Sequence, residues 1–279
     1  MTTADKIRDD VRDSYAKAVT SGGGCCGPRE MKGVAVKSAG YAAEELAALP
    51  DEAVANAFGC GNPLAFAEVQ PGQTVLDLGS GAGIDLLLAA RRVGPEGRVI
   101  GVDMTAEMIA KARANAAAAG ALQVEVRKGL IEALPVDDAS VDWVISNCVI
   151  NLSPEKDRVF SEISRVLRPG GRVSISDIVA EDLPAELRRD LAVYSACIGG
   201  AISERDYLAG MQRAGLVDPE VTDRLVYSPS QLTALVESEL DDSACGCGGA
   251  TLRDLVRQFA PHFAGKVWSA RITARKPNR

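Results

Sequence analysis

The sequence is poor in features that mark several common functional classes. Its 279 residues include one histidine, His262, near the C-terminus, and we expect it to have a surface or packing role. Reactions at carbon or oxygen nucleophiles usually need a positioned base, most often histidine, so this scarcity argues against histidine-based acid–base catalysis. The formal net charge is -7 and no run rich in lysine or arginine is present. Nucleic acid is therefore not an expected partner.

Long apolar segments are also missing. No stretch approaches the roughly 20 apolar residues that a membrane span needs, and the charged first residues lack the apolar core of a signal peptide. We therefore expect a cytoplasmic protein without membrane contacts. Nothing in the sequence demands more than a monomer, which is the expected state. Hydrophobic residues make up 47% and charged residues 25%, an ordinary globular composition that can bury a core.

Apolar runs that alternate with helical segments predict an α/β fold. Strands in such an arrangement lie parallel in one sheet, and the helices cross over it. Runs rich in apolar and β-branched residues predict strands over 74–79, 98–103, 122–129, 141–147 and 171–179. The intervening and preceding segments predict helices over 4–20, 84–94, 105–120 and 154–171, with two short helices within 42–69 around the Gly59–Pro63 turn.

The last hundred residues have a different pattern. A helical segment over 185–215 precedes two predicted strands, 220–227 and 266–275, with an acidic and glycine-rich loop between these strands. We place a boundary near residue 180. Three regions result, namely an N-terminal helical, cysteine-bearing segment over 1–69, a core over 70–180 and a C-terminal region over 181–279.

The strongest motif is a glycine-rich loop between a predicted strand and a predicted helix. It reads VLDLGSGAG, from Val75 to Gly83. Glycines at these positions allow a tight turn and a close approach of the backbone to a ligand. The third glycine comes one residue too early for the dinucleotide fingerprint G-x-G-x-x-G. Asp103 ends the next predicted strand, where a carboxylate can accept hydrogen bonds from ribose hydroxyls.

This motif in its strand–turn–helix setting resembles the class I S-adenosylmethionine-dependent methyltransferases, over residues 70–180. The resemblance implies a Rossmann-like sheet with helices on both faces, plus a smaller C-terminal α+β region. It also implies that the loop surrounds the methionine part of the cofactor, that Asp103 holds the ribose and that Met104 packs against the adenine. The residues expected to bind the cofactor are Asp77, Gly79, Ser80, Gly81, Gly83, Asp103, Met104, Ile131, Glu132 and Asn147.

Seven cysteines are present, at positions 25, 26, 60, 148, 197, 245 and 247. In a cytosolic protein they are more consistent with reduced thiols than with structural disulfides. Cys148 directly follows a predicted strand, at the edge of the sheet where α/β proteins bind ligands. Cys60 and Cys197 lie in glycine-containing segments that could fold over the same edge. No C-x₂-C pair indicates a zinc site, and any one of these cysteines alone is more readily a buried structural residue.

Trivalent arsenic is a substrate that would fit a site with several thiols and no general base. It carries its own lone pair, so its methylation needs no general base, and it is soft, so thiolates are its natural ligands. Three segments resemble the cysteine segments of the arsenite methyltransferases, and the resemblance runs from about residue 8 to about residue 275. They are AFGCGNP (57–63), SNCVINL (146–152) and SACIGGA (195–201).

This second resemblance implies a reaction and a site. Cys60, Cys148 and Cys197 would bind trivalent arsenic, presented as arsenite or as its thiol conjugates. S-adenosylmethionine would then donate methyl groups, giving mono-, di- and up to trimethyl arsenicals. Cys25 or Cys26 would pair with Cys60 in a disulfide relay that a thiol reductant, thioredoxin or glutathione, resets.

Other functions stay open from the residues alone. The chain could methylate a small organic acceptor, which predicts an apolar pocket and a base, or another soft element such as antimony or selenium. It could also sequester metalloids through its thiols without catalysis, which needs neither the glycine loop nor Asp103. Cys245 and Cys247 form a C-x-C pair that fits either arsenic capture or an exposed loop without a role.

Overall fold

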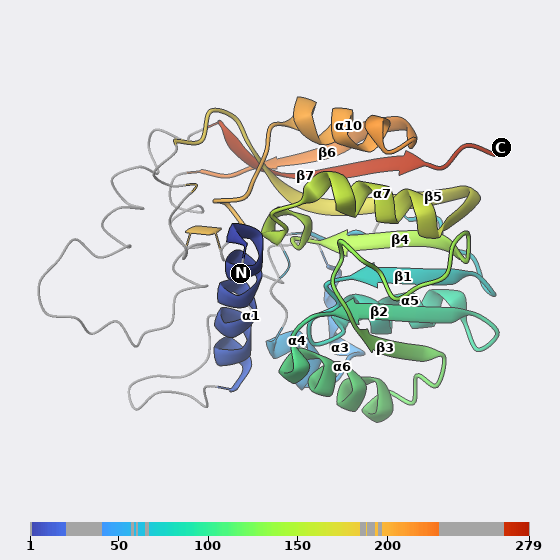
Figure 1. Ribbon diagram of the computed structural model, residues 1–279. Helices are drawn as coiled ribbons and strands as arrows, with labels where there is room; N and C mark the ends of the chain where they lie inside the picture. Colours follow the sequence, from blue (N-terminus) through green and yellow to red (C-terminus); the bar gives the residue numbers. More distant parts are fainter. Residues whose placement is uncertain are drawn as a thin grey trace, which may run out of the picture.

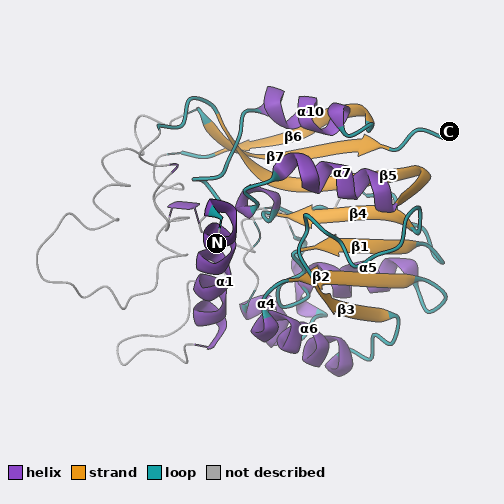
Figure 2. Ribbon diagram, viewed as in Figure 1, coloured by secondary structure: helices purple, strands orange, loops and turns teal. Residues whose placement is uncertain are grey.

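The computed structural model describes residues 2–20, 41–56, 59, 61–64, 67–184, 188, 193–194, 197–228 and 265–278. The strands are β1 (Thr74–Leu78), β2 (Arg98–Asp103), β3 (Val124–Lys128), β4 (Val141–Asn147), β5 (Leu167–Ala180), β6 (Val217–Val226) and β7 (Val267–Arg275). They form one sheet in the order β3-β2-β1-β4-β5-β7-β6 (Figures 1 and 2). Strands β1 to β5 pair in parallel, whereas β7 is antiparallel to β5 and β6.

Helices cover both faces of this sheet. They are α1 (Thr3–Thr20), α3 (Ala43–Ala47), α4 (Asp51–Ala55), α5 (Ile84–Val93), α6 (Ala106–Ala118), α7 (Lys156–Val166) and α10 (Glu204–Arg213), with a 3₁₀ turn, η1 (Ile150–Leu152). Alternate residues of a strand point to opposite faces. Val75 and Val99 accordingly belong to a core with α5 and α6, and Leu76 and Ile100 to a second core with α7 and α10. The predicted α/β fold is confirmed.

The structure differs from the sequence prediction in the short helices. The two helices predicted around the Gly59–Pro63 turn are α3 and α4, and both precede it. Pro50 separates them, because its ring cannot continue α3 and its φ of -56° suits the start of α4. Within the described part of 185–215, the long helix is α10, which begins after Ser203, whose side chain accepts a hydrogen bond from Asp206 N at 3.1 Å.

The two late strands complete the sheet of the core rather than forming a sheet of their own. Strand β7 pairs with β5 from Arg172↔Arg275 to Ala180↔Val267, and β6 pairs with β7 on the outer side. The boundary near residue 180 stays a prediction. Of the described helices, none combines the length and the apolar character that a membrane crossing requires.

Helix α1 lies across the carboxyl ends of the central strands. Figure 1 shows it upright, in dark blue, beside the ends at which β1, β2 and β4 finish. Val11 of α1 is buried in a third core with Leu152 and Ile178. Because ligands of open α/β sheets bind outside the carboxyl ends of the strands, α1 covers the edge where a site is expected.

Candidate active site

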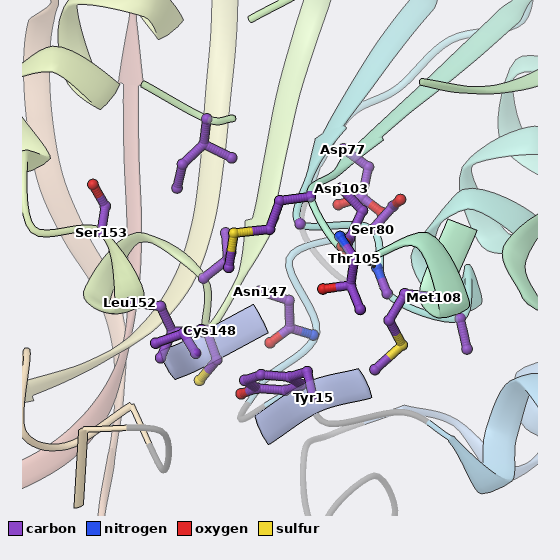
Figure 3. Close-up of a pocket in the computed structure, with 18 of the residues that line it drawn as sticks. Tyr15, Asp77, Ser80, Asp103, Thr105, Met108, Asn147, Cys148, Leu152 and Ser153 are labelled. Carbon is purple, nitrogen blue, oxygen red and sulfur yellow. Dashed lines mark hydrogen bonds between the residues drawn. The ribbon is translucent and has the colours of Figure 1, made fainter. Parts of the chain in front are cut away.

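A pocket lies at the carboxyl ends of β1, β2 and β4, and α1 contributes part of its lining (Figure 3). The loop from β1 to α5 enters it. Gly79, Gly81 and Gly83 have φ of 63°, 51° and 93°, a left-handed region that other residues disfavour. A Cβ on Gly79 would lie 2.3 Å from a methyl of Val149, whereas one on Gly81 would meet nothing nearer than 4.0 Å. The backbone at Gly81 is therefore open to a ligand.

Two polar side chains face the pocket beside this loop (Figure 3). Asp103 accepts hydrogen bonds from Gly81 N at 2.9 Å and from Thr105 N at 2.8 Å, one on each carboxylate oxygen. Ser80 is 6% exposed, and its Oγ has no hydrogen-bond partner among the described residues. A buried polar group without a partner costs about 1–3 kcal/mol. This Oγ lies toward Gly101 of β2, where a Cβ would be 2.7 Å from it.

Four buried carboxylates line the pocket, and the pKa values of three of them are raised. Burial raises the pKa of Asp85 to about 6, although its two side-chain hydrogen bonds oppose the shift. Burial, together with the negative charges of Asp85 and Asp103, raises the pKa of Asp77 well above its ordinary value. Burial also raises the pKa of Asp103, against its backbone hydrogen bonds. Arg8 is the single basic side chain among the described lining residues, so the pocket favours a cation.

The outer side of the pocket is formed by the segment after β3 and by α1. Met104, Ile131 and Glu132 line it together with Arg8. The Arg8 guanidinium donates to the Glu132 carboxylate from Nε at 3.1 Å, and its Nη2 donates to Glu155. Both Arg8 and Glu132 are largely buried. Charge-assisted hydrogen bonds of this kind are stronger than neutral ones, so they hold α1 against the pocket.

Cys148 and Cys197, far apart in the sequence, meet beside the pocket. Each is 4% exposed, and Cys197 Sγ donates a hydrogen bond to the Cys148 carbonyl at 2.7 Å. Their φ angles, 57° and 62°, lie in a region that costs a non-glycine residue about 1–2 kcal/mol. Cys197 is a reduced thiol, whereas Cys148 is disulfide-bonded. Strained backbone of this kind clusters at functional sites.

The residues on either side of Cys60 lie against the end of β4. Asn147 accepts a hydrogen bond from Gly61 N at 3.2 Å and donates one to Gly61 O at 2.7 Å. A Cβ on Gly59 would lie 2.2 Å from Asn147 Nδ2. Asn147 directly precedes Cys148, so this loop reaches the thiol pair Cys148–Cys197. The other predicted relay and arsenic cysteines lie outside the described residues, namely Cys25, Cys26 and Cys60, as do Cys245 and Cys247.

Comparisons with known proteins identify the family. A family model described as a methyltransferase domain matches residues 70–215. The crystal structure of an arsenic(III) S-adenosylmethionine methyltransferase from Chlamydomonas reinhardtii superimposes with a TM-score of 0.65 and is 34% identical, covering 84% of this chain and 72% of that chain. The chain belongs to the arsenite methyltransferase family.

Two further members of the arsenite methyltransferase family are similar in sequence. The arsenite methyltransferase of Halobacterium salinarum is 48% identical over 231 residues, which are 78% of this chain and 59% of that protein. That of Aquipseudomonas alcaligenes is 42% identical over 186 residues, 64% of this chain and 53% of that protein. The chain thus spans between half and two thirds of the length of these curated relatives.

In this family member, the residues predicted to bind the cofactor line the pocket, with one exception. Gly83 is not among the lining residues. It directly precedes α5 with φ 93°, and a Cβ there would lie 3.3 Å from the Cβ of Ala112 on α6. Its role in the structure is the turn into α5 and the close packing of α5 on α6. Binding of the cofactor by the other predicted residues stays a prediction.

Several residues at this pocket have no counterpart in the sequence prediction. Asp85 lines the pocket, and the signal for it is a single carboxylate in the otherwise apolar helix segment IDLLLAA. Arg8, Val11 and Tyr15 line the pocket from α1, and their i, i+3, i+7 spacing places them on one helix face. Tyr41 bonds to Asp85 at 2.8 Å, and no sequence pattern indicates this contact.

The left-handed backbone of Cys197 predicts an unusual order of stability. We expect Cys197→Gly to be about 0.5–1 kcal/mol more stable than Cys197→Ala. Alanine in the left-handed conformation is strained by about 1–2 kcal/mol, whereas the extra conformational entropy of glycine in the unfolded chain costs only about 0.5–1 kcal/mol. Urea unfolding of both variants measures the difference. At the exposed helical position Ala110, glycine should instead cost about 1 kcal/mol. A less stable Cys197→Gly would contradict the strained conformation.

Proposed function

We propose that the chain transfers methyl groups from S-adenosylmethionine to trivalent arsenic, held by Cys60, Cys148 and Cys197. The observation that carries the proposal is the meeting of Cys148 and Cys197 beside an acidic pocket, in a chain of the arsenite methyltransferase family. Gly61, which follows Cys60 by one position, exchanges two hydrogen bonds with Asn147, the residue before Cys148. This contact supports a site of three thiols rather than two.

The pocket fits S-adenosylmethionine, which supplies a sulfonium methyl group when bound and carries a net positive charge. The buried carboxylates favour that charge. Asp103 would hold the ribose hydroxyls, and Met104 and Ile131 would flank the adenine. The open backbone at Gly81 would bond to the methionine part, and Ser80 would line it. Each of these roles uses a group that the described residues leave available or oriented toward the pocket.

The thiols act as ligands rather than as nucleophiles. Three thiolates leave the lone pair of As(III) in place, and it attacks the methyl carbon while the carbon–sulfur bond breaks and leaves its electron pair on sulfur. Arsenic is thereby oxidised to As(V), and no proton is lost, so the transfer needs no general base. Such a transfer needs aligned atoms and little water. The burial of Cys148 and Cys197 meets the second condition.

Reduction completes the proposed cycle. Return of As(V) to As(III) takes two electrons, which two thiols supply by forming a disulfide. Arsenic binds to reduced thiols, so any disulfide at the site would have to be reduced before arsenic binds. We therefore include a thiol reductant, thioredoxin or glutathione, with Cys25 or Cys26 as relay. Arsenite or its thiol conjugates would be the substrate, and mono-, di- and trimethyl arsenicals the successive products of arsenic detoxification.

Product formation from arsenite, S-adenosylmethionine and a thiol reductant tests the proposal. Arsenic species are separated by chromatography and quantified over time, with heat-denatured protein as the control. We expect monomethyl arsenic to appear first and the higher methylated species later. If the protein binds S-adenosylmethionine but forms no methylated arsenical, the acceptor is antimony, selenium or an organic molecule instead. If it does not bind S-adenosylmethionine, thiol sequestration without catalysis is favoured.

A further inference from the structure

Asn151 is a fully buried polar residue that connects the surroundings of Cys148 and Cys197. It belongs to the 3₁₀ turn η1 and follows Cys148 by three positions. Its side-chain Nδ2 donates to the Cys197 carbonyl at 3.2 Å and to the Ile178 carbonyl at 2.6 Å. One amide thus joins three parts of the chain, namely the segment after Cys148, the end of β5 and the segment that contains Cys197.

The two acceptors determine the orientation of the Asn151 amide. A carbonyl oxygen can only accept hydrogen bonds, so Nδ2, which carries both amide hydrogens, must face Ile178 O and Cys197 O. The reversed amide would place Oδ1 against two carbonyl oxygens. Oδ1 has no hydrogen-bond partner among the described residues. The described bonds of this side chain therefore all come from Nδ2, and Cys197 receives one of them.

The backbone of Asn151 is also fixed from several sides. Its N–H donates to Asp177 Oδ2 at 3.2 Å, and its carbonyl accepts from Lys156 Nζ at 3.2 Å. A Cβ on Gly200 would lie 2.0 Å from the same carbonyl oxygen, so the segment of Cys197 packs directly on it. The amide of Asn151 therefore extends from a backbone that β5 and α7 hold in place.

The hydrogen bond from Asn151 does not depend on the thiol of Cys197. In contrast, the bond from Cys197 Sγ to Cys148 O, at 2.7 Å, uses the thiol hydrogen. A sulfur bonded to As(III) no longer carries this hydrogen, because the thiolate is the ligand form. Binding of arsenic thus removes the bond from Sγ and leaves the bond from Asn151 to the Cys197 carbonyl.

The Asn151 amide acts on Cys197 itself rather than on the ends of its segment. Within the segment, Cys197 N donates to Tyr194 O at 3.0 Å. Farther on, Ala180 N of β5 donates to Ile202 O at 3.2 Å. Cys197 has a left-handed φ of 62°, a conformation that persists only where its surroundings impose it. A bond to the carbonyl of this residue is one contact that does so.

We propose that Asn151 is a positioning residue of the arsenic site, whose amide holds the thiol of Cys197 beside Cys148. It acts through the Cys197 backbone and is not among the lining residues of the cofactor pocket. This role rests on the proposed function, because it concerns two of the three proposed arsenic ligands. It goes further by assigning to the site a residue that carries no thiol.

Cross-linking of the reduced protein tests the spacing of these two thiols without arsenic. Dibromobimane bridges cysteines that lie close together, and peptide mass spectrometry identifies the Cys148–Cys197 product. Asn151→Leu keeps the branching of the side chain and removes the donor. We expect the rate of bridging to fall roughly tenfold, which is within the range for a buried carbonyl left without its partner.

Monobromobimane separates the spacing of the thiols from their accessibility, because it attaches to one thiol and does not bridge two. Cys148 and Cys197 are each 4% exposed, so a general loosening would speed up their single labelling. The measured quantity is the rate of bridging divided by the rate of single labelling. This ratio should fall in Asn151→Leu. A slower bridging that only follows a slower single labelling would contradict the positioning role.

Asn115→Leu is the matched control. The Asn115 amide is 5% exposed and donates to the Ala82 carbonyl at 2.9 Å, so the substitution removes the same kind of donor from a buried site on α6. Its partner belongs to the cofactor loop rather than to a cysteine segment. The bridging ratio of Cys148 and Cys197 should therefore equal that of wild type. An equal fall in both asparagine variants would indicate a general effect of stability and overturn the proposal.

Two binding measurements by equilibrium dialysis connect the spacing to the site. We expect Asn151→Leu to bind arsenite roughly tenfold more weakly and S-adenosylmethionine within about twofold of wild type. Asn151→Ser is the milder variant, because its hydroxyl keeps a polar group but has one hydrogen for the two carbonyls. Its bridging ratio should also fall, and it decides if Asn151→Leu does not fold.

The outcomes distinguish this role from the proposed function. A wild-type bridging ratio in the folded Asn151 variants would overturn the positioning role, whatever their activity. If the wild-type protein binds no arsenite but the ratio still falls in these variants, the arsenic function fails and the role of Asn151 in spacing the two thiols stands.

Discussion

A Cys148→Ser variant is expected to methylate arsenite at least about 100-fold more slowly than the wild-type protein, because a lost ligand misplaces the arsenic that the other thiols hold. A serine hydroxyl has a similar shape but is a hard ligand, so it does not replace a thiolate on As(III). Cys148 lines the pocket and accepts the hydrogen bond from Cys197 Sγ at 2.7 Å. The measurement is the initial rate of methylated arsenical formation with excess reductant.

The affinity of the same variant for S-adenosylmethionine is the internal control, and it should stay within about twofold of wild type. The acidic side chains that favour the cofactor are untouched by the substitution. A Cys245→Ser/Cys247→Ser variant, whose cysteines the proposed site does not use, should keep the wild-type rate. Normal arsenite methylation by Cys148→Ser would remove Cys148 from the arsenic site.

The glycine loop and Asp103 of the pocket could be predicted from the sequence because their signals are local. The glycine loop, the strand before it and Asp103 belong to one strand–loop–helix–strand unit, and hydrophobic periodicity identifies each part of it. The order of the sheet was not predictable in the same way. Strands β6 and β7 were expected, but the insertion of β7 between β5 and β6 depends on pairing between segments far apart in the chain.

The thiol half depends on contacts that no local pattern encodes. Cys197 meets Cys148 across 49 positions and Tyr41 meets Asp85 across 44. Family resemblance identified the first pair, and nothing identified the second. The sequence does not predict the left-handed φ of Cys148 and Cys197 either, because glycine and asparagine, not cysteine, usually indicate that conformation. Tertiary contacts must impose it.

The buried carboxylates of the pocket predict a link between cofactor binding and pH. Burial raises the pKa of Asp85 to about 6 and that of Asp77 well above its ordinary value. The folded state therefore keeps a proton that the unfolded chain has lost, so the ligand-free protein should lose stability as pH rises from about 4 through about 6. A bound cation favours the ionised carboxylates. Its binding releases protons and so becomes tighter as pH rises.

We therefore expect S-adenosylmethionine to bind about tenfold more tightly at about pH 7.5 than at about pH 5, corresponding to about one unit of pKa change on binding. S-adenosylhomocysteine lacks the sulfonium charge and should change by no more than about twofold over the same range. Isothermal titration calorimetry at constant ionic strength, in buffers with different ionisation enthalpies, measures both the affinity and the number of protons released.

Asp85→Asn is the matched variant, because it removes one ionisable group at nearly constant volume and should flatten the profile of S-adenosylmethionine toward that of S-adenosylhomocysteine. Equal slopes for the two ligands in the wild-type protein would show that the carboxylates do not sense the sulfonium charge. A steeper pH dependence of affinity for S-adenosylmethionine than for S-adenosylhomocysteine would also affect product release. Methyl transfer converts a cation into a neutral ligand inside the same acidic pocket, so the attraction that retains the cofactor is absent when the product leaves.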